Sequence, residues 1–157
     1  MPPTPVAIAL GSNVGDRAAH LAFAVAELSR ILSDLRLSRL VDTEPVGVPD
    51  AQSRFLNAAV VGTTVLAPAT LLAELLAIER LRGRERPYHH APRTLDLDLI
   101  LYGGRIVREE GLEVPHPRFR ERLFVLEPLA EIAGDWRDPV TGSTISALLG
   151  SLRARPS

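Results

Sequence analysis

The stretch RTLDLDLILYGG, residues 93–104, predicts a β-strand that carries two acidic side chains on one face. Successive side chains of a strand point to opposite faces of the sheet. One face would carry Leu95, Leu97, Leu99 and Leu101, and the other would carry Asp96, Asp98, Ile100 and Tyr102. The two aspartates would lie about 6.5–7 Å apart along the backbone, because two strand rises separate them. The strand thus offers a pair of carboxylates that point the same way.

Together with this strand, the segments before it predict two β-α-β units. Strand composition occurs over residues 6–10, 35–41 and 54–65, and apolar residues recur at helical spacing over 18–32 and 71–81. Pro68 suits the first position of the second helix. After the strand, a Gly-Gly pair at 103–104 predicts a turn into another strand. A short helix over 120–126 that ends near Pro128, and a last helix over 144–152, complete the chain.

This order of elements predicts the fold class. Two β-α-β units followed by a tail are typical of an α+β fold, with a ferredoxin-like antiparallel sheet and helices packed on it in three layers (αβα). A length of 157 residues suits one domain, so we expect a single domain over residues 1–157.

The composition excludes several classes of protein. A formal net charge of −1 argues against a general nucleic-acid-binding protein and against a polybasic membrane anchor. The sequence has no cysteine, so it has no disulfide framework and no thiolate metal site. No apolar run approaches the ~20 residues of a membrane span, and the first residues lack the pattern of a secretory signal. We expect a cytoplasmic monomer that binds small molecules, with no nucleic-acid or membrane partner.

The basic residues are all arginines, because the sequence contains no lysine. Phosphate binding would therefore depend on arginine, histidine or backbone N–H groups. The segment GSNVGD, residues 11–16, has two glycines but lacks the Gly-Lys-Ser/Thr ending of a P-loop. We expect it to be a strand-to-helix turn, so that any ATP would be bound by metal ions and arginines.

The aspartate pair has two interpretations. Two acidic side chains on one strand face are commonly solvated, but here the same face continues with Ile100 and Tyr102. Arg93 precedes the pair by three residues, and four arginines lie just upstream, at positions 80, 82, 84 and 86. Two neighbouring carboxylates need a positive partner to stay ionised. Mg²⁺ suits a site with few oxygen ligands, since it keeps waters and shares substrate phosphates, and two such ions would orient a phosphoryl transfer.

Two further groups of residues leave alternatives open. Phe55 and Asn57 would share a strand face, where a ring and a carboxamide suit a flat heterocycle; a core Phe beside a loop-facing Asn is the plainer interpretation. His116, followed by Arg118, Arg120 and Arg122, could bind an anion or form a surface turn.

In this order, the segments ALGSNVGDR, TEPVGVPDAQSRFLNAAV, IERLRGRER, HHAPRTLDLDLILYGG and VPHPRFRERLFVLEPLAEI resemble the 6-hydroxymethyl-7,8-dihydropterin pyrophosphokinase family. The resemblance covers nearly the whole chain, and the APRTLDLDLI segment is its most specific part. It implies transfer of pyrophosphate from ATP to the pterin hydroxymethyl group, with release of AMP, in folate biosynthesis. It also implies two Mg²⁺ ions.

The resemblance assigns roles to individual residues. Asp96 and Asp98 match the metal-binding aspartates, and Arg84 and Arg93 match arginines that assist transfer. The pterin pocket would consist of Thr43, Pro45, Val46, Phe55, Asn57, Asp96 and Phe124. The ATP side would consist of Glu79, Arg84, Arg86, Arg93, Leu99, His116 and Arg122.

Two other functions remain as alternatives. A different two-metal nucleotidyl or phosphoryl transferase would use the same acids; a nucleotidyl transferase would release pyrophosphate rather than AMP. A non-catalytic ferredoxin-like metabolite-binding module would bind nucleotide without turnover. The approach of Arg84, Arg93, Asp96 and Asp98 to a ring pocket favours the pyrophosphokinase.

Overall fold

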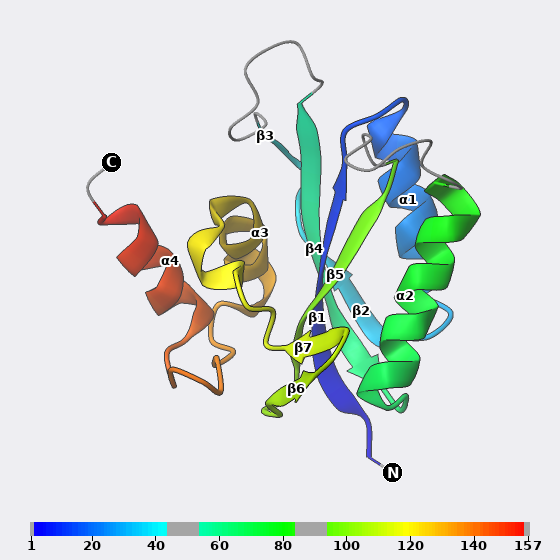
Figure 1. The fold of residues 1–157 in the computed structure, drawn as a ribbon. Coiled ribbons are helices and arrows are strands. Elements are labelled where there is room, and N and C mark those ends of the chain that lie inside the picture. The colour runs from blue at the N-terminus through cyan, green and yellow to red at the C-terminus, as the bar shows by residue number, and fades with distance from the viewer. Residues whose placement is uncertain (1, 44–53, 84–93, 156–157) are drawn as a thin grey trace.

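The computed structural model describes residues 2–43, 54–83 and 94–155. Its elements, in chain order, are β1 (Thr4–Ser12), α1 (Arg17–Leu28), β2 (Ser33–Leu37), β3 (Val41–Thr43), β4 (Phe55–Thr64), α2 (Pro68–Gly83), β5 (Asp96–Tyr102), β6 (Val107–Glu109), β7 (Leu112–Val114), the 3-10 helix η1 (Phe119–Glu121), α3 (Leu123–Ala133) and α4 (Ile145–Arg153). Figure 1 shows a central sheet with helices on both faces.

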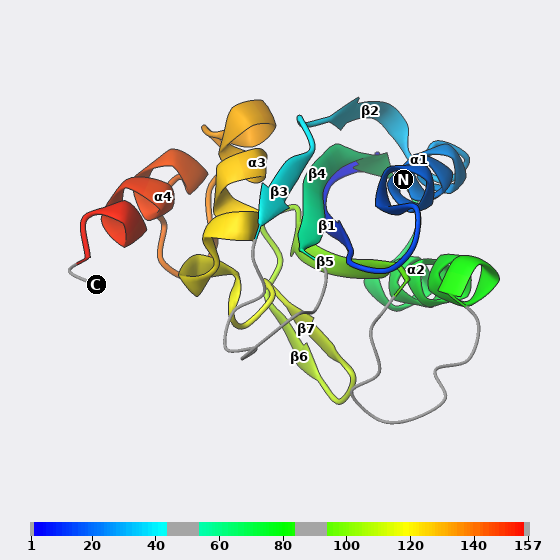
Figure 2. The same cartoon turned by 90° about the horizontal axis from the view of Figure 1, so that it is seen from above.

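The main sheet has the strand order β2-β4-β1-β5, and all its pairs are antiparallel. The first and third long strands are central, which is the ferredoxin-like arrangement. Helices α1 and α2 cover one face, and α3 and α4 lie on the other (Figure 2). The predicted α+β fold with three layers is confirmed.

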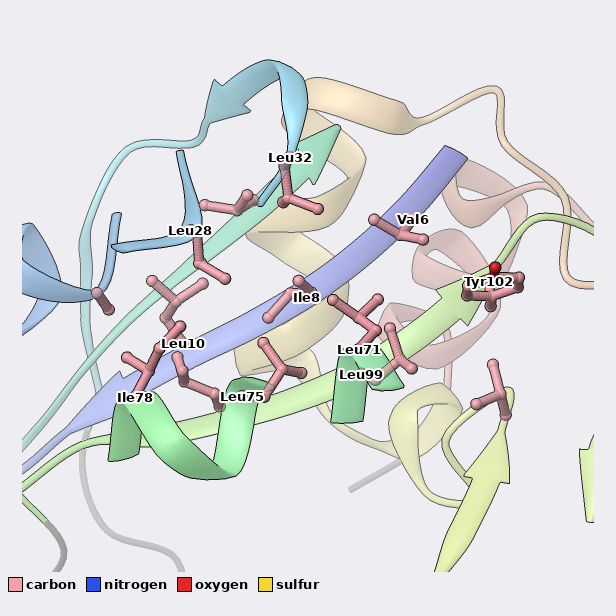
Figure 3. Close-up of a cluster of buried hydrophobic side chains, with 14 of the residues drawn as sticks. Val6, Ile8, Leu10, Leu28, Leu32, Leu71, Leu75, Ile78, Leu99 and Tyr102 are labelled. Carbon is pink, nitrogen blue, oxygen red and sulfur yellow. The ribbon is translucent and has the colours of Figure 1, made fainter. Parts of the chain in front are cut away.

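Strand β1 divides the hydrophobic core into two clusters, because its side chains alternate. Val6, Ile8 and Leu10 belong to the cluster under α1 and α2, which Figure 3 shows. Ala7 and Ala9 belong to the cluster under α3 and α4. The helices α1 and α2 contribute buried leucines to the first cluster, Leu21, Leu28, Leu71 and Leu75. Burial of one such side chain stabilises the fold by roughly 1.5–3 kcal/mol.

The expected alternation of β5 is right as far as Ile100 and wrong for Leu101 and Tyr102. Ala7 pairs with Leu101 and Ile8 pairs with Leu99, so Ile100 is an extra residue in the ladder, which makes a β-bulge. Leu101 therefore lies with Ile100 in the cluster under α3, and Tyr102 lies in the opposite cluster. The Tyr102 hydroxyl donates a hydrogen bond to the Leu66 carbonyl at 2.5 Å. The aspartates precede the bulge, so their shared face is unaffected.

The predicted strand over 35–41 is divided between β2 and β3, because the ladder with β4 is interrupted at Ser38. The Ser38 N–H donates to the Ala59 carbonyl, but the Ala59 N–H donates to the Ser38 hydroxyl instead of to a backbone carbonyl. A side chain thus replaces the main chain in the ladder. Both β2 and β3 pair with β4 on either side of this point.

Two predicted boundaries are also corrected. Helix α1 ends at Leu28 rather than at residue 32, although Leu32 is still buried. The predicted helix over 120–126 is η1 followed by α3, which continues through Pro128, because burial of Val125, Leu126 and Leu129 outweighs the hydrogen bond that proline cannot donate. The strand predicted after the Gly-Gly turn is confirmed as β6, which pairs with β7. Within the described residues, no helix is long and apolar enough to cross a membrane.

A buried ion pair attaches η1 to the segment before α4. The Asp138 side chain is fully buried and accepts hydrogen bonds from Arg120 Nε at 2.5 Å and Arg120 Nη2 at 2.9 Å. The Thr141 hydroxyl and the Val140 N–H also donate to it. Burial alone would raise the pKa of Asp138, but these hydrogen bonds outweigh burial and lower the pKa below its usual value.

We predict that Asp138→Asn destabilises the protein by about 2–3 kcal/mol, because Arg120 then lacks its buried anion. Because the folded pKa is lowered, the wild-type contribution is fully present above the ordinary carboxyl pKa of about 4 and is lost as pH falls through the folded value. The difference in free energy of unfolding between wild type and variant should be constant from about pH 7 to about pH 5 and shrink below about pH 4. Urea denaturation at several pH values measures it.

Glu127→Gln is the matched control, since Glu127 pairs with Arg153 at 2.7 Å on the surface. An exposed pair contributes about 0–1 kcal/mol, so this variant should change stability little. Equal effects of the two variants would contradict the structural role of Asp138.

Candidate functional site

A cavity of about 490 Å³ lies on the α3 side of the sheet, at the end where β1 stops and β4 and β5 begin. The strands supply its floor and η1 and α3 supply its rim. Its lining consists of Ala9, Leu10, Gly11, Thr43, Phe55, Asn57, Asp96, Asp98, Arg118, Glu121, Arg122, Phe124 and Val125.

Strand register places three lining residues in one row. Gly11 of β1 pairs with Asn57 of β4 on one side and with Asp96 of β5 on the other. Ala9, two residues earlier in β1, pairs with Asp98. Paired residues on one face have neighbouring side chains. The carboxamide and the two carboxylates therefore lie on the same face of three adjacent strands, with small residues between them.

Asn57 is held in a defined orientation. Its side chain is 5% exposed, and its Nδ2 donates a hydrogen bond to Thr43 Oγ1 at 2.6 Å. Thr43 belongs to β3 and pairs with Phe55. Phe124 belongs to α3 and lines the same cavity from the rim, facing the sheet. Two aromatic rings from different elements and one fixed amide therefore surround the space, as a flat heterocycle requires.

The carboxylates of Asp96 and Asp98 suit Mg²⁺, which needs few protein ligands, better than they suit a metal ion that is held by protein side chains alone. Both carboxylates line the cavity, as their shared face predicts. The described part of the chain contains no group of three or more His, Asp or Glu side chains that could hold a metal. Mg²⁺ commonly takes only one or two carboxylates and completes its shell with waters and substrate phosphates. The pair therefore suits a metal that arrives with a phosphate substrate.

The arginines near η1 separate into two roles. Arg120 turns away to the buried Asp138, whereas Arg118 and Arg122 line the cavity. Neither Arg118 nor Arg122 forms a salt bridge with any described residue. The Arg122 guanidinium carbon lies 5.6 Å from the centre of the Phe124 ring. The rim therefore carries two positive charges that are available to an anionic ligand.

His116 binds the backbone of the first of these arginines, and its surroundings disfavour the charged form of its ring. The His116 N–H donates to the Ile100 carbonyl at 3.0 Å, and the His116 ring Nδ1 accepts from the Arg118 N–H at 3.2 Å. Burial first, and then the charge of Arg122, lower the pKa of His116, although Asp96 and Glu113 oppose this. A neutral ring with Nδ1 as acceptor carries its proton on Nε2, which is then a hydrogen-bond donor.

Two residues predicted for the ATP side act through the backbone of β5. Glu79 of α2 accepts a hydrogen bond from the Leu97 N–H at 2.6 Å and so connects α2 to the edge of this strand. The Leu99 side chain is 4% exposed and packs in the cluster under α1 and α2. Leu99 can therefore meet a ligand in this cavity only with its main chain.

The structure brings together seven of the predicted residues: Thr43, Phe55, Asn57, Asp96, Asp98, Arg122 and Phe124. Pro45, Val46, Arg84, Arg86 and Arg93 lie outside the described residues. Sequence reasoning missed Gly11 and Glu121 and left Arg118 as an open alternative. No local pattern marks Gly11, because its position depends on which strands pair with β1.

Comparison with known proteins assigns the family. The family model described as 7,8-dihydro-6-hydroxymethylpterin-pyrophosphokinase (HPPK) matches residues 7–134. The chain belongs to this family. HPPK proteins are ATP-dependent diphosphokinases of folate biosynthesis.

Individual relatives agree with this assignment. A 2-amino-4-hydroxy-6-hydroxymethyldihydropteridine pyrophosphokinase of Bacillus subtilis is 48% identical over 127 residues, which are 80% of this chain and 75% of that protein. One of Methylorubrum extorquens is 44% identical over 147 residues, 92% of this chain and 91% of the relative. The HPPK-DHPS of Plasmodium falciparum has a TM-score of 0.77 at 14% identity, covering 96% of this chain and 45% of that one, which supports the fold. The chain spans only 19% of the folic acid synthesis protein fol1 of Pneumocystis carinii.

We predict that Arg118→Gln raises the KM for ATP about tenfold, since one charged hydrogen bond to a phosphate would be lost. AMP formation at several ATP concentrations measures this effect. Arg108→Gln is the control, because Arg108 is exposed on β6 and does not line the cavity. An unchanged KM for ATP in Arg118→Gln would mean that this arginine does not contact the nucleotide.

Proposed function

We propose that this cavity binds 6-hydroxymethyl-7,8-dihydropterin beside the phosphates of ATP and that the protein transfers pyrophosphate from ATP to the pterin hydroxymethyl group, releasing AMP. The row formed by Asn57, Gly11 and Asp96 is the main support. It sets a group suited to a heterocycle next to a group suited to a metal and its phosphates. The two substrates would then meet within one cavity of about 490 Å³.

The pterin would occupy the part of the cavity near β3 and β4. Phe55 and Phe124 would stack against its two faces. Asn57 and Thr43 would bind its polar edge, and Pro45 and Val46 would add contacts from residues outside the described ranges. The asymmetry of the site supports this assignment, because the aromatic residues come from β4 and α3 and the acids come from β5.

The phosphates of ATP would lie near β5 and η1. Asp96 and Asp98 would hold Mg²⁺, for which we propose two ions, and the metal would supply positive charge against the phosphate oxygens. Arg118 and Arg122 would neutralise further charge from the rim. Glu79, Arg84, Arg86, Arg93, Leu99 and His116 complete the proposed ATP side.

The chemistry needs positioning more than a dedicated base. The pterin alcohol oxygen forms a bond to the β-phosphorus, the bond between that phosphorus and the oxygen bridging to the α-phosphate breaks, and AMP leaves. The alcohol proton passes to water or to a phosphate oxygen. The two rings and Asn57 would align the alcohol, and the arginines would stabilise charge on the transferring group.

Other properties of the proposed enzyme follow from the sequence. We propose a single domain over residues 1–157 that works as a cytoplasmic monomer without nucleic-acid or membrane partners. The rival nucleotidyl transferase would release pyrophosphate, and a binding module would release nothing. Product analysis with ATP, Mg²⁺ and the dihydropterin separates the three functions, since only the proposed reaction forms AMP and a pyrophosphorylated pterin.

We predict that Asp96→Ala and Asp98→Ala each lower the rate of AMP formation by about 10³-fold or more, because the metal loses half of its protein ligands. The fold should persist, as neither carboxylate belongs to the hydrophobic clusters. Steady-state assays together with circular dichroism measure both properties. Glu110→Ala, at an exposed turn after β6, should retain full activity. Substantial activity in either aspartate variant would rule out the proposed metal site.

We predict that Phe55→Ala mainly raises the KM for the dihydropterin, by about tenfold to a hundredfold, because one stacking surface is lost. The KM for ATP should change little, since Phe55 lies on β4, away from the acids of β5. Assays in which each substrate is varied in turn distinguish the two effects. A larger change in the KM for ATP than for the pterin would reverse the proposed assignment of the two halves of the cavity.

A further inference from the structure

Gly11 occupies a position where glycine is costly and its backbone freedom is not used. It lies within β1, paired on both sides, and its φ is outside the left-handed region. A glycine inside a strand is less favourable than alanine, because it loses more backbone freedom on folding. Backbone conformation therefore does not require glycine at position 11, whereas the limited space beside it does.

The space beside Gly11 is limited by one atom of the site. A Cβ built on Gly11 would lie 3.1 Å from Asn57 Oδ1, which is closer than an ordinary van der Waals contact, and 3.9 Å from the Leu56 carbonyl oxygen. No atom of Asp96 lies within 4 Å of that Cβ, although Asp96 is the paired residue on the other side. A side chain at position 11 would therefore disturb the amide and leave the carboxylate in place.

The Asn57 amide has little freedom to move away. Its Nδ2 is bound to Thr43 Oγ1 at 2.6 Å, and its side chain is 5% exposed. Thr43 thus holds one end of the amide while Gly11 leaves room for the other. In this orientation the amide nitrogen faces Thr43 and the amide oxygen faces Gly11, which lines the cavity.

We infer that Gly11 is a positioning residue for substrate selection: by lacking a side chain it lets the Asn57 amide keep the orientation that binds the polar edge of a flat heterocycle. This inference rests on the proposed function, because it takes the pterin as the ring that Asn57 binds. Gly11 and Thr43 act on the same amide from opposite sides. The nucleotide half of the cavity does not depend on Gly11.

The test compares three glycine-to-alanine variants. Gly11→Ala should raise the KM for the dihydropterin about tenfold and change the KM for ATP less than twofold. Gly62→Ala is the structural control, since its Cβ would meet the Ser33 carbonyl oxygen at 2.9 Å; it should lower the Tm without altering the KM for the pterin. Gly104→Ala, with no atom within 4 Å of its Cβ, should change neither.

A double-mutant cycle with Thr43→Val separates positioning from simple crowding. Thr43→Val removes the hydroxyl that holds the amide, so the amide can yield to a methyl group at position 11. The combined variant should raise the KM for the pterin by less than the product of the two single effects. Fully multiplicative effects would overturn the inference, as would an unchanged pterin KM in Gly11→Ala or equal changes in both substrate KM values.

Direct binding distinguishes failure of this inference from failure of the proposed function. Calorimetry with dihydropterin, Mg²⁺ and a non-hydrolysable ATP analogue measures ring binding without turnover. If the wild type forms no AMP but binds the pterin more tightly than Gly11→Ala does, the inference stands and the proposed reaction fails. If the wild type is active and both proteins bind the pterin equally, the reaction stands and the inference fails. A wild type that neither reacts nor binds overturns both.

Discussion

The antiparallel pairing of β1 with both β4 and β5 is the constraint on which the rest of the structure depends. It places the large side chains of β1 under α1 and α2 and leaves Ala7, Ala9 and Gly11 facing α3. The same register brings Asn57 and Asp96 to either side of Gly11. A slip of one residue would exchange the two faces of β1. One set of backbone hydrogen bonds thus determines both the core and the site. A change in the register of β1 would disrupt both.

Arginine provides the positive partner in each of the ion pairs that surround these strands. Asp138 binds Arg120 in a buried site, and Asp42 of β3 binds Arg17 and Arg54 at the surface. The hydrogen bond from Arg17 is the main cause of the lowered pKa of Asp42. The pairs of Asp42 connect α1 and the residue before β4 to β3, and the pair of Asp138 connects η1 to the segment before α4. Arg118 and Arg122 form no such pair with the described residues, which suits them to a phosphate ligand.

Errors in the predicted fold have a common physical origin. Tyr102 changed faces because β5 gains a residue relative to β1, and a bulge depends on the partner strand as well as on the strand itself. Helix α3 continues through Pro128 because its apolar side is buried against the sheet. Local helix propensity does not include this burial. The break at Ser38 depends on Ala59, a residue 21 positions away. In each case a contact between distant segments outweighed a local preference.

The sequence by itself determined the α+β class, the order of the main elements, the shared face of Asp96 and Asp98, and the family. These follow from periodicity and motifs, which are local properties of the chain. Only the tertiary structure decided that Gly11 separates Asn57 from Asp96, that Arg120 is structural while Arg118 lines the cavity, and that the Leu99 side chain is turned away from it. The physical reason is that the row joins three strands separated by about 40 residues or more, and their register is set by the simultaneous burial of both sheet faces.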